Sequence, residues 1–393
     1  MLSRRHFLQK SSIVSLAPVL PHVFGRTANA AELDADEKVL IVVQLDGGND
    51  GLNTVVPYAD DAYGRARKKL KIPTKDLLKL DDHLGLHPSM RSAKELFDDG
   101  RFSIVQGVGY PNPDRSHFRS MKIWQTARFD DDQHDNNGWL GRTLDMDTFA
   151  GKKNSIYVGQ QETPVALWGR KSEAISLSRE EDLQLALDPA ILSRTSGVKT
   201  DLQQFVSKQV LAAYESADEF KQQSTKTENE SKYPKTRLGS QLKLVSQLLK
   251  SGSRSRIFYT SQSGYDTHSS QLSNHRTLLR EYADAVKALL DDLKAAGLDD
   301  RVVVLTFSEF GRRIEENDSL GTDHGTAGPV FLAGAPIKGG LIGDPPNLSD
   351  LVDGDLKVQH DFRSIYATIL KQWLEVEPAA ILGDEFTLLP LLD

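Results

Sequence analysis

Val39-Leu40-Ile41-Val42-Val43-Gln44-Leu45, followed by Asp46-Gly47-Gly48-Asn49-Asp50-Gly51, is the stretch of sequence that decides the fold. Its first part is a nearly unbroken run of aliphatic and β-branched residues, which is typical of a strand buried on both faces. Strands of this kind occur in parallel sheets that are covered by helices on both sides. Similar short runs recur along the chain, at 102–108, 155–158, 256–260, 301–307 and 329–333. We therefore expect these runs to be the core strands of one mostly parallel sheet.

Helical patterns separate the predicted strands. Over 275–296, apolar residues recur at helical spacing, and Gly297 follows where a helix would end. Because strand 256–260, this helix and strand 301–307 follow in order, they form a β-α-β unit. The sequence thus predicts an α/β fold with a doubly wound, three-layer sheet. A second amphipathic helix, predicted over 361–374, is expected to pack on that sheet.

The centre of the chain has a different composition from the rest. Residues 216–236 are polar and lack any apolar period, and segments with helical spacing flank them at 201–214 and 238–249. This pattern favours an exposed, mobile insertion. We expect one α/β domain over 31–393 with a helical and polar insertion around 161–250.

The N-terminal thirty residues carry an export signal. Arg4 and Arg5 precede Phe7, Leu8 and a lysine, which matches the twin-arginine pattern. The apolar stretch 11–24 is too short and too interrupted to span a bilayer, and Ala28-Asn29-Ala30 has the form of a signal-peptidase site. We therefore expect the twin-arginine translocase as a partner, cleavage near Ala30, a periplasmic or extracellular location and no stable membrane anchor.

Charge and cysteine content exclude several kinds of function. Removal of 1–30 takes away four basic residues and no acidic one, which leaves 44 basic and 55 acidic residues. An acidic surface without a basic patch disfavours nucleic-acid binding. The chain has no cysteine, so disulfides and thiolate metal sites are excluded and the hydrophobic core must supply the stability.

Residues suited to metal binding follow the predicted strands. Ligands in open α/β sheets bind beyond the carboxyl ends of the strands, and there the sequence places Asp46, Asn49, Asp50, Asp266, His268 and Glu309. Asp323 and His324 lie just before the predicted strand 329–333. Each group alone is compatible with an ordinary turn or loop. Four groups at four strand edges favour a divalent metal ion, with zinc, manganese, magnesium and calcium as candidates.

Three further residues have two readings each. Ser116 precedes a predicted helix, so it is either an N-cap or a nucleophile activated by a nearby metal. His117 is either a ligand or general acid, or a packing or solvent-exposed residue. Arg312 either clamps an oxyanion or pairs with Glu315 or Glu316 at the surface.

Six motifs together carry a resemblance to a known family. They are 44–54 (QLDGGNDGLNT), 116–118 (SHF), 138–142 (GWLGR), 264–268 (GYDTH), 306–312 (TFSEFGR) and 322–327 (TDHGTA). In this order, behind a twin-arginine leader, they resemble the uncharacterised "domain of unknown function 1501" family. The resemblance extends over essentially the whole mature chain.

That family is similar to the alkaline phosphatase and sulfatase superfamily, which implies an alkaline phosphatase-like fold and a set of roles. Asp46 would match the first metal ligand and Ser116 the nucleophile. Further ligands would be Asp266, His268, Glu309 and His324. Two departures concern a second metal ion: one residue separates Asp266 from His268 where the superfamily has three, and Phe310 follows Glu309 where the superfamily has histidine.

The resemblance implies an exported metal-dependent hydrolase that acts on a phosphate or sulfate ester of a small molecule or a polymer. A sulfatase that forms formylglycine is disfavoured, because Ser116-His-Phe-Arg lacks the required Cys/Ser-x-Pro-x-Arg context. Ser116 or a water activated by the metal would attack the ester. The alternative is a non-catalytic exported binding or assembly protein on a phosphatase-like scaffold.

Overall fold

Strand β1 (Val39–Asp46) lies inside the main sheet and pairs in parallel with β8 (Ile257–Ser263) and β9 (Val302–Ser308). The computed structural model describes residues 37–129, 137–149, 154–178, 233–250 and 252–393. The predicted leader 1–30, the predicted helix 201–214 and most of the polar segment 216–236 lie outside the described residues. The aliphatic run that ends at Asp46 is therefore a central strand, as predicted.

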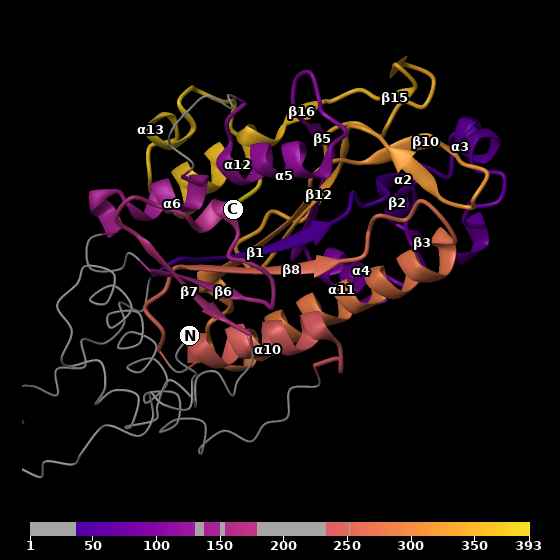
Figure 1. The fold of residues 1–393 in the computed structure, drawn as a ribbon. Coiled ribbons are helices and arrows are strands. Elements are labelled where there is room, and N and C mark those ends of the chain that lie inside the picture. The colour runs from indigo at the N-terminus through magenta and orange to yellow at the C-terminus, as the bar shows by residue number, and fades with distance from the viewer. Residues whose placement is uncertain (1–36, 130–136, 150–153, 179–232, 251) are drawn as a thin grey trace, which may run out of the picture. The chain divides into compact units, whose positions relative to one another are not determined.

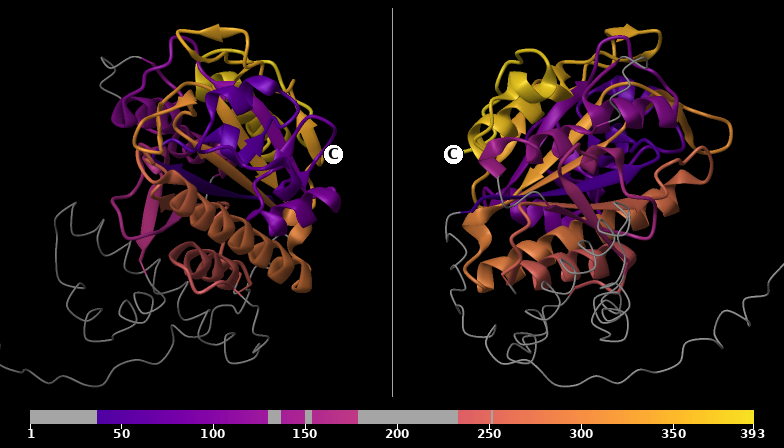
Figure 2. Two further views of the ribbon diagram at one scale, coloured as in Figure 1. Left: turned by 90° about the vertical axis from the view of Figure 1, so that its right-hand side faces the viewer. Right: turned by 60° about the vertical axis from the view of Figure 1, so that its left-hand side comes forward.

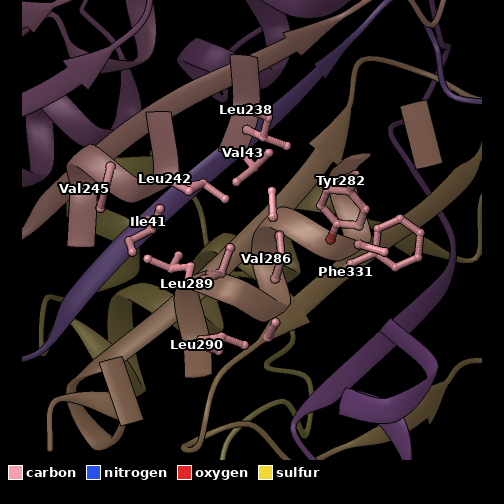
Figure 3. Packing of buried hydrophobic residues seen from close by; sticks show 14 of the residues in the cluster. Ile41, Val43, Leu238, Leu242, Val245, Tyr282, Val286, Leu289, Leu290 and Phe331 are labelled. Atoms are coloured by element: carbon pink, nitrogen blue, oxygen red, sulfur yellow. The ribbon is translucent and has the colours of Figure 1, made fainter. Parts of the chain in front are cut away.

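The two faces of β1 enter two different hydrophobic clusters. Ile41 and Val43 pack with the helices on one side, whereas Leu40 and Val42 pack with the helices on the other. Figure 3 shows the first of these clusters, in which Ile41 and Val43 lie among side chains of two long helices. Burial on both faces explains why the sequence of this strand does not alternate between apolar and polar residues.

The order of the sheet, within the described residues, is β13-β5-β12-β9-β1-β8-β6-β7, with β16 also paired to β5. The strands not yet bounded are β5 (Phe102–Gly109), β6 (Asn154–Val158), β7 (Glu173–Leu177), β12 (Gly328–Ala333), β13 (Gly340–Ile342) and β16 (His360–Asp361). All described pairings in this sheet are parallel except those of β12, which is antiparallel to β9 and β5.

The antiparallel strand β12 is compatible with the predicted mostly parallel sheet. A parallel neighbour of β9 needs a crossover connection, usually a helix. Instead, the chain between β9 and β12 forms the antiparallel pair of β10 (Arg312–Glu316) and β11 (Thr322–His324), so it returns in the opposite direction. The predicted β-α-β unit is present, but β1 lies between its two strands.

Helices cover both faces of the sheet, which confirms the predicted α/β class. One side carries α4 (Arg91–Asp98), α10 (Arg237–Lys250) and α11 (Gln271–Ala295); the other carries α5 (His117–Thr126), α6 (Trp139–Leu144), α12 (Phe362–Thr368) and α13 (Pro378–Leu382). Figure 1 shows these two layers, and Figure 2 shows α10 and α11 side by side.

The predicted helices are present with shifted ends. Helix α11 begins four residues before the predicted start at 275, and Gly297 takes a φ of 69° just beyond its end. The predicted helix 361–374 is α12 followed by a π-helical turn, Ile369–Trp373. Within the described part of the chain, no helix is both long enough and apolar enough to cross a membrane.

Short elements complete the described structure. They are α2 (Gly51–Thr54), α3 (Asp61–Ala66), β2 (Val55–Val56), β3 (Leu78–Lys79), β4 (Gly85–Leu86), β14 (Leu351–Val352), β15 (Asp355–Leu356) and the 3₁₀ turns Thr74–Asp76, Asp147–Phe149, Val165–Leu167 and Asp299–Arg301. A third, smaller hydrophobic cluster, which includes Leu52, Tyr63 and Ile314, joins several of them.

Candidate metal centre

Asp266 lies at the centre of a group of side chains beyond the carboxyl end of β8. Its Oδ1 atom is 3.0 Å from Nε2 of His268, 3.2 Å from Nε2 of His324 and 3.5 Å from Nε2 of His117. We call Asp266 and these three histidines the Asp266 cluster. Ligand atoms of Asp266, His117 and His324 all lie within 4.8 Å of one another. The parallel strands, the start of α5 and β11 thus bring together residues that are distant in sequence.

Each histidine of the cluster holds its other ring nitrogen against an oxygen atom. The contacts are His117 Nδ1 with Glu309 Oε1 at 2.8 Å, His268 Nδ1 with Asp323 Oδ1 at 3.2 Å, and His324 Nδ1 with the Arg115 carbonyl at 2.8 Å. Carboxylate and carbonyl oxygens only accept hydrogen bonds, so each Nδ1 donates. In the neutral tautomer this leaves the Nε2 lone pair for the centre of the cluster, which is the arrangement of metal-binding histidines.

The Nε2 atoms of the cluster lack partners that would satisfy them. His117 Nε2 is buried and has no hydrogen-bond partner. His268 Nε2 and His324 Nε2 face each other at 2.9 Å, although both rings already donate through Nδ1. Two lone pairs at this distance repel each other unless a proton or a cation lies between them. The imidazole nitrogens of His117 and His324 and a carboxylate oxygen of Asp266 therefore fit a divalent ion, and His268 lies beside them.

Electrostatics differ among the residues of the cluster. Burial raises the pKa of Asp266, but the hydrogen bond from Arg312 and the proximity of His324 outweigh burial and lower that pKa to about 2. The hydrogen bond to Glu309 raises the pKa of His117, whereas burial lowers the pKa of His324. Asp266 is thus an anion at neutral pH, and His324 is favoured in the neutral form that binds metal.

Glu309 supports the cluster from behind His117. It is buried, and its Oε1 accepts from the Gly47 main-chain N–H at 2.9 Å as well as contacting His117. Its Oε2 accepts from the Ser308 hydroxyl at 3.0 Å. The sequence pattern predicted Glu309 as a direct ligand, and the structure places it one step further out, where it orients His117.

Arg312 uses its donors within the protein. Its side chain is fully buried, with Nε donating to the Gly48 carbonyl at 2.7 Å and Nη1 to the Thr322 carbonyl at 2.7 Å. Nη2 donates to the Gly47 carbonyl and, at 2.7 Å, to Asp266. The predicted oxyanion clamp would need donors that face a ligand, whereas this guanidinium fixes the loops that carry the cluster. The alternative surface pairing with Glu315 or Glu316 also does not fit a buried side chain.

Asn49 and Asp50 belong to a separate buried network. Asp50 pairs with Arg67 at 2.7 Å, and both side chains are fully buried. Asn49 Oδ1 lies 2.9 Å from Nε2 of His275. These contacts fix the loop after β1, and no described side-chain contact links the two residues to the Asp266 cluster. Asp323 contacts the cluster as the partner of His268.

Ser116 and Asp46 differ in position and exposure. Ser116 is exposed at the N-cap of α5, and its side chain makes no capping hydrogen bond. Asp46, at the end of β1, accepts a hydrogen bond from Gln44. Burial raises the pKa of Asp46 to about 6. A cavity of about 570 Å³, large enough for a small molecule, has Asp46, His117, Asp266 and Glu309 among its lining residues.

Sequence reasoning missed two supporting groups. The Arg115 carbonyl orients His324, and a main-chain atom leaves no signal in the residue type. Gln44 donates to Asp46, while its own carbonyl accepts from Gln125 at 2.8 Å. Here a signal was available, because a glutamine in an aliphatic strand two residues before Asp46 points to the same face of the sheet.

Comparison with known proteins gave one family. The profile of a family described as "Protein of unknown function (DUF1501)" matches residues 37–376. No curated protein matches the chain significantly.

Several solved structures are similar to the chain at low sequence identity. The C-terminal periplasmic domain of EcEptC from Escherichia coli in complex with Zn is 11% identical, over 77% of this chain and 75% of that one, with a TM-score of 0.36. Alkaline phosphatase from the Antarctic bacterium TAB5 is 12% identical, over 76% and 91%, with a TM-score of 0.33. The lipoteichoic acid synthase LtaP from Listeria monocytogenes is 10% identical, over 81% and 69%, with a TM-score of 0.34.

Proposed function

The chain belongs to the DUF1501 family of proteins of unknown function, and we propose from its site that it is a metal-dependent hydrolase of phosphate or sulfate esters. One observation carries the proposal. Three histidines, each held through Nδ1, direct their Nε2 atoms at one oxygen of Asp266 beside a cavity. Such a donor set supports the binding of a catalytic divalent ion at the cavity wall.

His117, His268, His324 and Asp266 would hold the ion. A bound divalent ion supplies a Lewis acid that polarises an ester oxygen and offsets the negative charge of the transition state. The supporting acceptors Glu309 and Asp323 keep the imidazoles in the tautomer that presents Nε2. The buried Arg312 holds Asp266 as an anion, so that no proton competes for this oxygen at neutral pH.

Asp46 is proposed as the group that takes a proton from the nucleophile. Its carboxylate lines the cavity, and its pKa of about 6 suits proton transfer near neutral pH. The sequence pattern instead predicted Asp46 as a metal ligand. An Asp46→Asn variant separates the two roles, because a base is needed for turnover but not for metal content. Loss of the bound metal in this variant would assign Asp46 as a ligand.

The nucleophile is either the Ser116 hydroxyl or a water molecule. In both cases the attacking oxygen forms a bond to phosphorus or sulfur, and the bond to the alcohol oxygen breaks. If Ser116 attacks, acid quenching during turnover traps a phosphorylated or sulfated Ser116 that peptide mass spectrometry detects, and Ser116→Ala abolishes turnover. If water attacks, Ser116→Ala retains most of the activity.

Metal content is the primary test of the proposal. Full-length protein purified without chelators is expected to contain one divalent ion per chain by inductively coupled plasma mass spectrometry, and His268→Ala and His324→Ala are expected to lose it. His83→Ala, an exposed histidine away from the cluster, is the matched control. If both cluster variants retained the metal of the wild-type protein, the assignment of the site would be rejected.

Ester turnover by the metal-loaded protein then separates the enzyme from the alternative scaffold. Hydrolysis of a phosphate or sulfate ester that is lost in Asp266→Asn supports the hydrolase. A protein that binds metal but hydrolyses no ester in a broad panel would instead be a binding or assembly protein on the same scaffold.

Export is a separate part of the proposal, because residues 1–36 lie outside the described structure. The leader sequence supports export by the twin-arginine translocase, with cleavage near Ala30 and a periplasmic or extracellular location. Replacement of Arg4 and Arg5 by lysine is expected to retain the precursor in the cytoplasm. N-terminal sequencing of the exported wild-type protein is expected to begin at Ala31.

A further inference from the structure

The cavity beside the Asp266 cluster has an apolar wall that the proposed ester chemistry does not use. Phe118, Met121 and Val165 line it together with Lys122 and Gln125. Five lining residues come from α5, and four of them, Phe118 and the residues three, four and seven positions after it, lie on one face of the helix. The fifth is His117, so the same helix supplies a residue of the cluster and the apolar residues of the cavity.

Phe118 is the feature of this wall that needs an explanation. Its side chain is 92% exposed, the most exposed large hydrophobic residue in the described part of the chain. A single exposed apolar side chain is ordinary, but this one continues into Met121 and Val165 along one cavity wall. Contiguous apolar surface in a concave site is typical of ligand binding.

Two glycines also line the cavity. Gly47 and Gly264 follow β1 and β8, and both have positive φ values, 117° and 113°. At Gly47 a Cβ atom would lie 2.3 Å from the main-chain nitrogen of Asp266, so a larger residue would displace the loop that carries the cluster. Glycine is therefore needed at position 47, where the loop after β1 packs closely against the loop after β8.

We infer that the substrate is a phosphate or sulfate ester of an apolar alcohol, with the ester at the Asp266 cluster and the apolar part against Phe118, Met121 and Val165. This inference rests on the proposed function, because that function places the ester group. The Lys122 side chain on the same helix face complements the negative charge of the ester. A small polar alcohol would leave the apolar wall in contact with water.

Two measurements test the inference with the metal-loaded, full-length protein. The first is the hydrolysis of 1-naphthyl phosphate against glycerol 2-phosphate, and the second is the calorimetric affinity for 1-naphthylmethylphosphonate against hydroxymethylphosphonate, neither of which can be hydrolysed as an ester. We expect at least a tenfold preference for the naphthyl compound in both, in KM and in Kd.

Phe118→Ser is expected to reduce this preference about tenfold, chiefly through KM. Because the ring is exposed, the substitution removes no core contact and the variant folds. Val352→Ser, which replaces another exposed apolar residue that is not part of the cavity wall, is the matched control and retains the preference.

The outcomes distinguish the inference from the function on which it rests. Equal turnover of both esters with equal Kd values for both phosphonates would overturn the inference and leave the hydrolase in place. Preferential binding of the naphthyl phosphonate, lost in Phe118→Ser, without turnover of any ester would support the apolar subsite and reject the hydrolase. A preference that Phe118→Ser leaves unchanged would also overturn the inference.

Discussion

Two aspartate–arginine pairs follow the strands of the sheet, and they differ in what remains for other groups to bind. Asp50 and Arg67 are both fully buried, and Gln271 also donates to Asp50. Asp266 is 48% exposed beside the buried Arg312, and the Nε2 atoms of three histidines lie within 3.5 Å of its Oδ1 atom. The first pair is satisfied within the protein, whereas the second lies among further ligand atoms that the proposed metal ion would bind.

This difference separates residues that stabilise the fold from residues that bind. In both pairs the arginine lowers the pKa of the aspartate against the opposing effect of burial. The pKa direction alone therefore does not identify a functional carboxylate. The two aspartates differ instead in the number of further ligand atoms that surround the carboxylate.

The largest expected effect is the loss of stability in Asp50→Asn. The substitution leaves the charge of Arg67 buried without its partner, so the free energy of unfolding should fall by about 3–5 kcal/mol. Urea denaturation followed by circular dichroism measures this change. If Asp50→Asn unfolded at the same urea concentration as the wild-type protein, the Asp50–Arg67 pair would not stabilise the fold and the proposed difference between the two pairs would be wrong.

Asp266→Asn should change metal affinity more than it changes the free energy of unfolding. Because Asp266 is half-exposed and the buried Arg312 keeps its hydrogen bonds to main-chain carbonyls, the replacement should lower the unfolding free energy of the metal-free protein less than Asp50→Asn does. Loss of a charged ligand should lower zinc affinity about 100-fold or more, as measured by competition with a fluorescent chelator. Retained affinity together with a large loss of stability would place Asp266 with Asp50 as a structural residue.

A smaller effect is expected from acid. The pKa of Asp50 is lower in the folded protein than in the unfolded chain, so its stabilisation is complete above the ordinary aspartate range and disappears as pH falls through the folded-state value. Below about pH 4, the unfolding free energies of metal-free wild-type protein and Asp50→Asn should therefore converge. Urea curves at several pH values test this, and a constant difference between the two proteins would contradict it.

Much of the fold could be predicted from the sequence. The aliphatic run of β1 identified a strand buried on both faces, and the spacing of apolar residues located α11 and α12. The direction of β12 could not be predicted in this way, because an apolar run reports burial and not orientation. The π-helical turn after α12 was also missed, since it preserves a nearly helical spacing of buried residues.

The site was predicted less completely, for a physical reason. The rule that ligands gather at the carboxyl ends of strands selected Asp266, His268 and His324. The role of each side chain depends on the atoms around it, and Glu309 and Arg312 could not be placed before their buried contacts were known. The sequence did not decide whether His117 is a ligand or general acid, or a packing or solvent-exposed residue. The spacing of apolar residues does not show which way the first residue of a helix points.

The position of His324 on the β10–β11 hairpin has a kinetic consequence. In this hairpin His324 pairs with Arg312, outside the main sheet. In the proposed site His324 would hold the ion from this hairpin, so release of the ion and transient opening of the hairpin are expected to be coupled. Amide hydrogen exchange across 312–324 should slow when the ion is bound, and the lifetime of the bound ion would then report how often this small hairpin separates from the rest of the protein.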